Sequence, residues 1–330
     1  MTRPPRFCNL YVIQQPAEAA PARSGRHPPE HLDAIDRNRW APSRRKNRAQ
    51  SPEYAMLREA FEYLTTPCPP LARRYGYLAE ALALGARHRR QMRAWAPHVD
   101  ACRRFVQEAA EQVPRGGRAL VAGSGLLIEI QLSTLAKRFD EVLLIDMVHT
   151  HAVRRQVRRH SNVRLLTLDV TGTLDRLDAV SDGQPLPSPY PPVPPGERFS
   201  FAVSCNLLSQ LPLLPLEVID RKAPATSPAE RERFAQALAL SHLSWLASVA
   251  TQAALFTDTE SQWLEQGTLR EREDSLWGLG LPPPDRSWDW DIAPAPEEDR
   301  RRSLRHRVGA WFSPPVPIGP LPCDRHRSPP

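Results

Sequence analysis

Three short apolar runs between residues 119 and 168 constrain the fold of this chain more than any other feature. The first run enters a glycine turn, Gly123-Ser124-Gly125, and the second and third end in the carboxylates Asp146 and Asp169. Continuous apolar runs of this length are typical of strands in a parallel sheet that is covered on both faces. The carboxyl ends of parallel strands lie on one edge of the sheet, so the pattern predicts a nucleotide-type site at that edge.

The glycine turn supports this prediction locally. Glycine at 123 and 125 lets the backbone turn sharply and approach a ligand, because no Cβ stands in the way. Apolar residues recur with helical spacing after the turn, so we expect a helix that begins there and directs its free N–H groups at the ligand. These apolar residues are Leu127, Ile130, Leu132 and Leu135. Asp146 ends the second strand, where a carboxylate can accept bonds from two ribose hydroxyls.

With these residues the chain resembles the class I S-adenosylmethionine-dependent methyltransferases over roughly residues 95–312. That superfamily combines a looser glycine turn with an acid after the second strand and often another after the third, the place of Asp169. Residues 199–212 resemble the family's fourth strand and the polar, leucine-rich turn that follows it. The glycine motif is divergent, with Val121 where an acid is usual and Leu127 where a third glycine is usual.

The resemblance implies an α/β fold with a doubly wound, mostly parallel seven-stranded sheet of Rossmann-like type and an N-terminal helical extension. It implies S-adenosyl-L-methionine as the cofactor, held by the glycine turn and by residues that end strands two to four. These cofactor-binding residues are Gly123, Ser124, Gly125, Asp146, Met147, Asp169, Val170 and Asn206. On the acceptor side it implies Asn206 and Gln210 as positioning groups, with Asp258 or Glu260 as a possible base after a fifth strand at 253–257.

Composition divides the chain into successive parts. Residues 1–50 are rich in Pro, Arg and Ala without sustained periodicity, so we expect them to be disordered. A helical cover at 51–113 precedes the cofactor-binding domain at 114–312, and a loose tail follows at 313–330. The domain contains a proline-rich insertion at 184–197, whose PxxP spacing could bind a partner but which we interpret as a solvated linker.

The ends of the ordered region carry two further expectations. Tyr75, Trp95 and His98 of the helical cover could reach the acceptor, although helix-on-helix packing is the favoured interpretation for Tyr75 and Trp95. Residues 288–292 and 306–312 are expected to form an antiparallel strand pair at the end of the sheet.

Charge and cysteine content bear on the remaining functional classes. The net charge is +7, but nearly all basic residues are arginine and their clusters lack interleaved aromatic residues, so nucleic acid is a partner that the sequence does not favour. The five cysteines are odd in number and lack C-x-x-C spacing, which supports neither a disulfide framework nor a zinc site, and no catalytic metal is expected. No apolar run approaches membrane-spanning length and no secretory signal pattern is present, so the expected location is cytoplasmic.

The predicted function is methyl transfer to a small-molecule acceptor, a reaction for which an enzyme mainly supplies alignment and a dry pocket. The charge leaves an RNA or protein methyltransferase as one alternative. A nicotinamide-dependent oxidoreductase is another, although Ile128 fits poorly where an NAD motif needs a third small residue. A non-catalytic Rossmann-like binding protein is the last.

Overall fold

The computed structural model describes residues 52–315, with side chains from Leu57 onward. The disorder expected for residues 1–50 therefore lies outside the described residues, as does most of the expected loose tail. Helix α1 (Pro52–Thr65) comes first, and residues 59–315 belong to one compact unit of the chain, which contains the sheet and every other helix of the described part.

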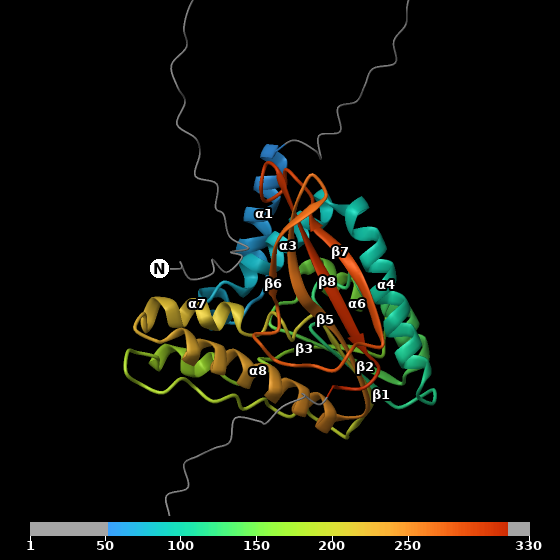
Figure 1. The fold of residues 1–330 in the computed structure, drawn as a ribbon. Helices are drawn as coiled ribbons and strands as arrows, with labels where there is room; N and C mark the ends of the chain where they lie inside the picture. Colours follow the sequence, from blue (N-terminus) through green and yellow to red (C-terminus); the bar gives the residue numbers. More distant parts are fainter. Residues whose placement is uncertain (1–51, 316–330) are drawn as a thin grey trace, which may run out of the picture. The chain divides into compact units, whose positions relative to one another are not determined.

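An eight-stranded sheet organises this unit, with the strand order β3-β2-β1-β4-β5-β8-β7 and with β6 paired to β5 (Figure 1). The strands are β1 (Arg118–Ala122), β2 (Glu141–Asp146), β3 (Val163–Thr167), β4 (Phe199–Cys205), β5 (Ala250–Glu265), β6 (Thr268–Asp274), β7 (Arg286–Ala293) and β8 (Arg302–Trp311). Strands β1 to β5 run parallel to one another, whereas β6 and β8 are antiparallel to β5 and β7 is antiparallel to β8. The predicted mostly parallel sheet and its final antiparallel pair are confirmed, and β6 is an additional strand.

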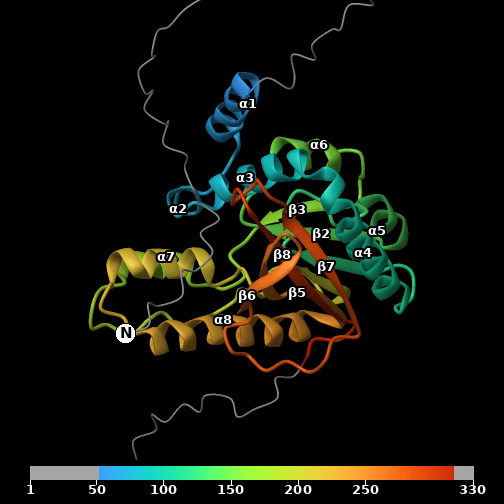
Figure 2. The ribbon, with the colours of Figure 1, turned by 45° about the horizontal axis from the view of Figure 1, so that its top comes forward.

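Helices cover both faces of the sheet, as in a doubly wound fold. Figure 2 shows the sheet between α8 on one face and α4 and α5 on the other. The remaining helices are α2 (Pro70–Arg74), α3 (Tyr77–Arg90), α4 (Met92–Glu111), α5 (Leu132–Arg138), α6 (His151–Val157), the 3-10 helix η2 (Leu174–Ala179), α7 (Leu213–Lys222) and α8 (Pro228–Val249). None of the helices between residues 52 and 315 is long and apolar enough to span a membrane.

The apolar runs of the sequence form the buried centre of the sheet. Residues 119–122 of β1 are 0% exposed, because β2 and β4 flank the strand and helices cover both of its faces. Val121 lies in this run and is part of the core.

Two local predictions are wrong. The chain does not enter a helix at the glycine turn; a loop follows, and α5 begins only at Leu132. Within this loop Leu127 adopts a φ of 58°, a left-handed conformation that glycine adopts without strain, while its side chain is buried. Strand β5 also continues well beyond residue 257, so Asp258 lies inside a strand and not after one.

The proline-rich insertion at 184–197 is fixed to the domain by hydrogen bonds. Tyr190 N–H donates to the Thr171 carbonyl (2.9 Å), and the Trp245 indole donates to the Pro192 carbonyl (2.9 Å). The Tyr190 carbonyl lies so close to Gly172 that a Cβ there would stand 1.8 Å from it. The insertion is thus attached to the domain at these points, while most of its residues are exposed or partly exposed, Tyr190 and Val193 at 80%.

Candidate functional site

The glycine turn and Asp146 meet at the edge of the sheet where the parallel strands end, here called the carboxyl edge. Gly125 N–H donates to Asp146 Oδ2 (2.7 Å), and Val148 N–H makes a longer bond to Asp146 Oδ1 (3.4 Å). A carboxylate offers about four acceptor positions, so Asp146 keeps capacity for two more donors. Burial raises the pKa of Asp146, while Gly125 N–H and the charge of His149 lower it. Asp146 thus stabilises the glycine turn and can still accept hydrogen bonds from a ligand.

Asp169 has no such capacity left. Its Oδ1 accepts the N–H and the hydroxyl of Thr171 (2.9 and 2.6 Å), and its Oδ2 accepts the N–H groups of Thr173 and Leu174 (both 2.9 Å). Four donors fill the positions of one carboxylate. Asp169 therefore fixes the start of η2, and its side chain has no free position for a ligand amine.

Three further residues were expected near the cofactor: Ser124, Met147 and Val170. Ser124 is buried in the turn and its hydroxyl has no hydrogen-bond partner, so it is an unused polar group at the carboxyl edge. Met147 and Val170 follow the two strand-ending acids and pack against the main hydrophobic core. His149 is buried, and its Nε2 lies 3.2 Å from the Leu166 carbonyl.

The structure joins Asn206, which follows the end of β4, to Asp258 inside β5. The Asn206 amide donates to Asp258 Oδ2 (3.2 Å), and its carbonyl accepts Asp258 N–H (2.9 Å). Both side chains are about 5% exposed, yet Asp258 Oδ1 has no hydrogen-bond partner. Gln210 is exposed on the turn after β4 and does not join this pair. Glu260 points to β6, where it pairs with Arg272 (3.1 Å).

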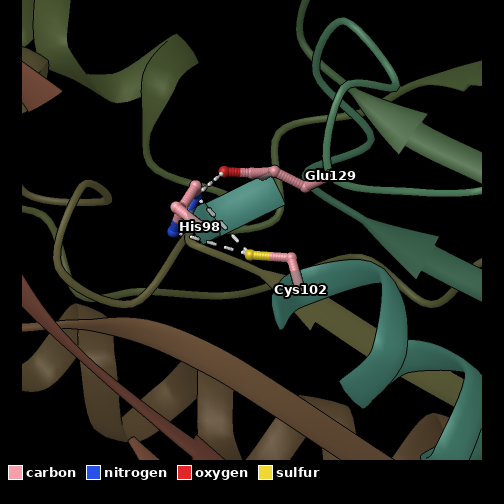
Figure 3. A group of neighbouring side chains, drawn as sticks. All are labelled: His98, Cys102 and Glu129. Carbon is pink, nitrogen blue, oxygen red and sulfur yellow. Dashed lines mark hydrogen bonds and ion pairs between the residues drawn. The ribbon is translucent and has the colours of Figure 1, made fainter. Parts of the chain in front are cut away.

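A second polar group, here called the His98 cluster, consists of His98, Cys102, Glu129 and Trp288. Figure 3 shows His98 and Cys102 of α4 beside Glu129 of the loop after the glycine turn. The Trp288 indole N–H donates to His98 Nδ1 (3.0 Å), and His98 Nε2 lies 2.8 Å from Glu129 Oε1. Because the indole can only donate, Nδ1 must be the acceptor and Nε2 must carry the proton. His98 therefore donates to Glu129 as a neutral imidazole. The ring also stacks on Trp290 at 4.1 Å.

This proton arrangement opposes metal binding, although the ligand atoms of His98, Cys102 and Glu129 lie within 4.8 Å of one another. A metal on Nε2 would require the proton on Nδ1, where it would face the N–H of Trp288. Burial also raises the pKa of the Cys102 thiol well above its usual value, which disfavours the thiolate that a metal needs. The residues form a hydrogen-bonded cluster rather than a metal centre.

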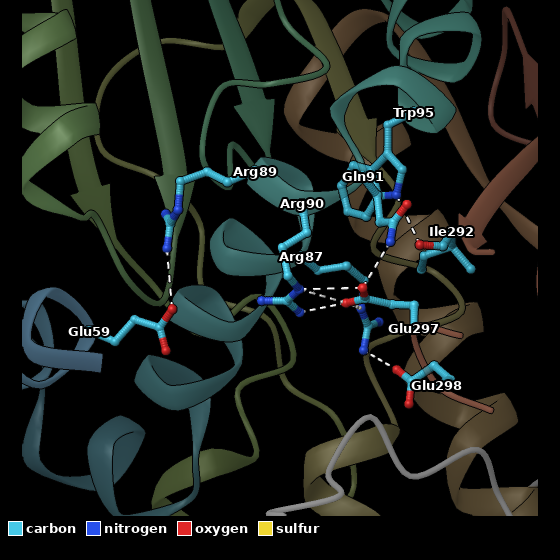
Figure 4. Close-up of polar contacts among 9 residues, drawn as sticks. All are labelled: Glu59, Arg87, Arg89, Arg90, Gln91, Trp95, Ile292, Glu297 and Glu298. Atoms are coloured by element: carbon cyan, nitrogen blue, oxygen red, sulfur yellow. Dashed lines mark hydrogen bonds and ion pairs between the residues drawn. The ribbon is translucent and has the colours of Figure 1, made fainter. Parts of the chain in front are cut away.

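The other two residues of the helical cover that could reach an acceptor have structural roles. The Tyr75 hydroxyl donates to Asp178 (2.7 Å), and burial followed by this bond raises the pKa of Tyr75 to about 12. The Trp95 indole donates to the Ile292 carbonyl (2.9 Å) beside the ion pairs that join α3 to the loop between β7 and β8 (Figure 4). Of the three, only His98 contacts a carboxylate near the carboxyl edge.

Sequence reasoning missed Glu129 and His306. The sequence predicted a helix that begins at the glycine turn, in which Glu129 would be an ordinary surface residue. His306 lies on β8, where its Nδ1 is 2.9 Å from the Ser261 hydroxyl, and its pKa is lowered by burial and raised by Asp258. The available signal for Glu129 was an acid four residues after the glycine turn in a segment with no clear helix cap.

Several solved structures are similar to this chain. The chain is similar to the N-methyltransferase NodS from Bradyrhizobium japonicum WM9 in complex with S-adenosyl-L-homocysteine, at 10% identity over 64% of this chain and 85% of that one, with a TM-score of 0.32. It is also similar to 1,6-didemethyltoxoflavin-N1-methyltransferase from Burkholderia thailandensis, at 14% identity over 75% and 94% of the two chains, with a TM-score of 0.31. A third is magnesium protoporphyrin IX methyltransferase from Synechocystis PCC 6803, at 10% identity over 77% and 90%, with a TM-score of 0.31. No protein-family model and no curated protein matches the chain.

Proposed function

We propose that this chain is a methyltransferase that moves the methyl group of S-adenosyl-L-methionine to a small-molecule acceptor. The observation that carries the proposal is the chemistry of the carboxyl edge around the glycine turn. Asp146 retains acceptor positions suited to two ribose hydroxyls, and the loop after the turn presents the carboxylate Glu129 where a helix start was expected.

These features favour a cationic cofactor over a dinucleotide. A dinucleotide site places a diphosphate against the N-terminus of the helix that follows the glycine turn. Here no helix begins at the turn, and the loop that replaces it carries the negative charge of Glu129. A sulfonium and an ammonium group are compatible with that charge, whereas a diphosphate is repelled by it.

The residues at the carboxyl edge fit S-adenosylmethionine. Asp146 would accept the ribose hydroxyls, and the unpartnered Ser124 hydroxyl offers a further polar contact. When bound, the cofactor supplies an activated methyl group on sulfur. We do not assign the adenine amine to Asp169, because four donors of the chain already occupy that carboxylate.

The acceptor side supports a small substrate. Asn206 and Asp258 are about 5% exposed, so a reactive group must be narrow to reach them. Two hydrogen bonds fix the Asn206 amide and the Asp258 carboxylate relative to each other. Side chains fixed in this way are suited to positioning an acceptor. Gln210 belongs at most to the entrance of this region.

Calorimetry with S-adenosylhomocysteine tests the proposal. Asp146→Ala should weaken binding by about 1–3 kcal/mol, because charge-assisted hydrogen bonds to the ribose are lost. Asp140→Ala is a matched control, since Asp140 accepts Gly117 N–H (2.7 Å) beside the opposite end of β2 and should not affect affinity. The wild-type chain should not bind NADH.

Two results contradict the proposal. One is the absence of S-adenosylhomocysteine binding by the wild-type chain. The other is equal affinity in the Asp146→Ala and Asp140→Ala variants, which would remove Asp146 from the cofactor site.

A further inference from the structure

A cavity of about 510 Å³ lies between α4, the start of α5 and the end of α6. Its volume is within the range of sites that bind small molecules. The residues that we propose for the cofactor and the acceptor, among them Asp146, Asn206 and Asp258, do not line it. The cavity is therefore a separate candidate site.

Three arginines converge on this cavity from two elements. Arg103 and Arg104 come from α4, and Arg159 follows the end of α6. The side chains of Arg104 and Arg159 form no hydrogen bond or ion pair with any residue between 57 and 315. Arg103 uses its Nε–H for the Ile128 carbonyl (3.0 Å), so its other N–H donors remain available. Asp100 is the one acid among the described lining residues, and it pairs with none of the three.

The arginines of β8 show that unpaired guanidinium groups are not a general property of this arginine-rich chain. Arg302 lies 2.7 Å from Glu271, Arg305 lies 2.7 Å from Asp291, and Arg307 lies 2.9 Å from Asp289. Each arginine of that strand thus has a carboxylate partner. The arginines of the cavity lack one, and an anionic ligand would supply it.

The rest of the cavity wall indicates what such a ligand carries besides its charge. Leu127, Ile130 and Leu132 form an apolar part of the wall and are only 3–4% exposed. Apolar contact of this kind favours an organic molecule over a bare inorganic ion. None of the described lining residues is Phe, Tyr or Trp, the side chains on which nucleic-acid bases stack.

We infer that this cavity binds a small phosphate monoester with an apolar organic part. Three arginines against one aspartate leave the wall with a net charge of +2 when His160 is neutral. A phosphate monoester carries about −1.5 to −2 near neutral pH, whereas a carboxylate would leave half of that charge unmatched. Planar guanidinium groups also match phosphate oxygens with two parallel hydrogen bonds. This binding site goes beyond the proposed methyl transfer and does not rest on it.

Calorimetry on the full-length chain tests the ligand class. The probes are phenyl phosphate and hexyl phosphate, compared with phenol, hexanol, benzoate and inorganic phosphate. We expect at least one ester to bind roughly tenfold or more tightly than its alcohol, than benzoate and than inorganic phosphate, because only the ester offers both the dianion and the apolar part.

Two competition experiments locate the ester. Saturating S-adenosylhomocysteine should not displace it, since the cavity is not lined by the residues proposed for the cofactor. A single-stranded RNA oligonucleotide without terminal phosphates should not displace it either, because its phosphates are monoanionic diesters and the cavity wall provides no aromatic platform among the described residues.

The Arg104→Gln and Arg159→Gln variants test the residues. Both side chains are exposed and without partners in the described part of the chain, so we expect an unchanged melting temperature. Ester binding should weaken roughly fivefold or more in each variant, since a charge-assisted pair of hydrogen bonds is lost. Arg233→Gln is the matched control: it removes one exposed arginine from α8, on the opposite face of the sheet from α4 and α5 (Figure 2), and should bind the ester like the wild type.

Each other outcome overturns the inference. If neither ester binds more tightly than its alcohol, or if benzoate or inorganic phosphate binds equally well, the cavity does not select a phosphate monoester. If the two cavity variants behave like Arg233→Gln, or if S-adenosylhomocysteine displaces the ester, the ester binds elsewhere. Displacement by the oligonucleotide would identify the arginines as part of an RNA-binding surface instead.

Discussion

His242 shows how one buried side chain can make stability depend on pH. It lies on α8, about 1% exposed, with Nε2 2.8 Å from the Ser204 hydroxyl and no hydrogen-bond partner for Nδ1. Burial lowers the pKa of His242 to about 4, below the 6.5 of an unfolded histidine. The unfolded chain therefore binds this proton first, and acid favours unfolding.

We expect the contribution of His242 to the free energy of unfolding to be constant above pH 6.5 and to fall as the pH is lowered to 4. The loss amounts to about 3 kcal/mol over that interval. Urea unfolding of the wild type and of His242→Gln at several pH values measures it, because glutamine does not titrate. If the difference between the two proteins is the same at pH 7 and pH 5, the histidine is not held neutral by the fold.

Asn206 shows how backbone and side chain can require the same residue. Its φ of 48° lies in the left-handed region, which asparagine tolerates better than most residues, and its amide reaches across to Asp258. The sequence marked Asn206 as a strand-ending polar residue. It could not show that the partner would be Asp258, because Asp258 was expected beyond the end of β5.

At the scale of elements, the 3-10 helix η2 depends on Asp169. Asp169→Ala removes four hydrogen bonds at its start, and we expect it to lower the free energy of unfolding by about 2–4 kcal/mol. Asp175→Ala in the same helix is a control, since that side chain is 79% exposed. Urea unfolding measures both. Unchanged stability together with a large loss of S-adenosylhomocysteine affinity would return Asp169 to the cofactor site.

The sequence pattern predicts a helix directly after the glycine turn, where the structure has a loop. Leu127 and Ile130 are buried loop residues, and with Leu132 and Leu135 of α5 they produce the spacing of a helix face. Periodicity records which residues are buried and not how the backbone buries them. By contrast, the buried strands β1, β2 and β4 were predictable, because short continuous apolar runs between turns have few other uses in an α/β sequence.

At the scale of the whole molecule, the pairing of distant segments was beyond the sequence pattern. His98 and Glu129 are on different elements, and Trp288 joins them from β7. Each is an unremarkable residue in its own segment, so no local spacing marks the three as partners. The parallel sheet, by comparison, was predictable from the continuous apolar runs without knowledge of any single contact.

Part of the positive charge of the chain lines a cavity of about 510 Å³ between α4, α5 and the end of α6. Basic side chains on its wall are Arg103, Arg104 and Arg159, together with the acid Asp100. Leu127 and Ile130 of the loop after the glycine turn also line it. The cavity therefore brings together α4, this loop and the end of α6, which are separate segments of the sequence.

The expectation for residues 1–50 remains a prediction from composition. They lack the apolar content needed to offset the entropy cost of ordering a chain. A variant that begins at Ser51 should keep the melting temperature of the full-length chain to within about 2 °C, since small effects on stability shift melting by a few degrees. A lower melting temperature, or resistance of the Arg23–Arg48 region to trypsin in the native protein, would show that these residues pack.

Strand β6 affects how this protein behaves in a crowded solution. It pairs with the outer part of β5, beyond the end of β4, and every residue of β6 except Glu273 is exposed. An open strand edge invites a second chain to add a strand, and charged side chains make that addition unfavourable. β6 alternates arginine and glutamate from Arg270 to Glu273 and pairs three of these charges with Glu265, Arg302 and Glu260. Once β6 has formed, the exposed edge of the sheet therefore carries charged side chains. These charges disfavour edge-to-edge pairing with another chain and so protect the protein from aggregation.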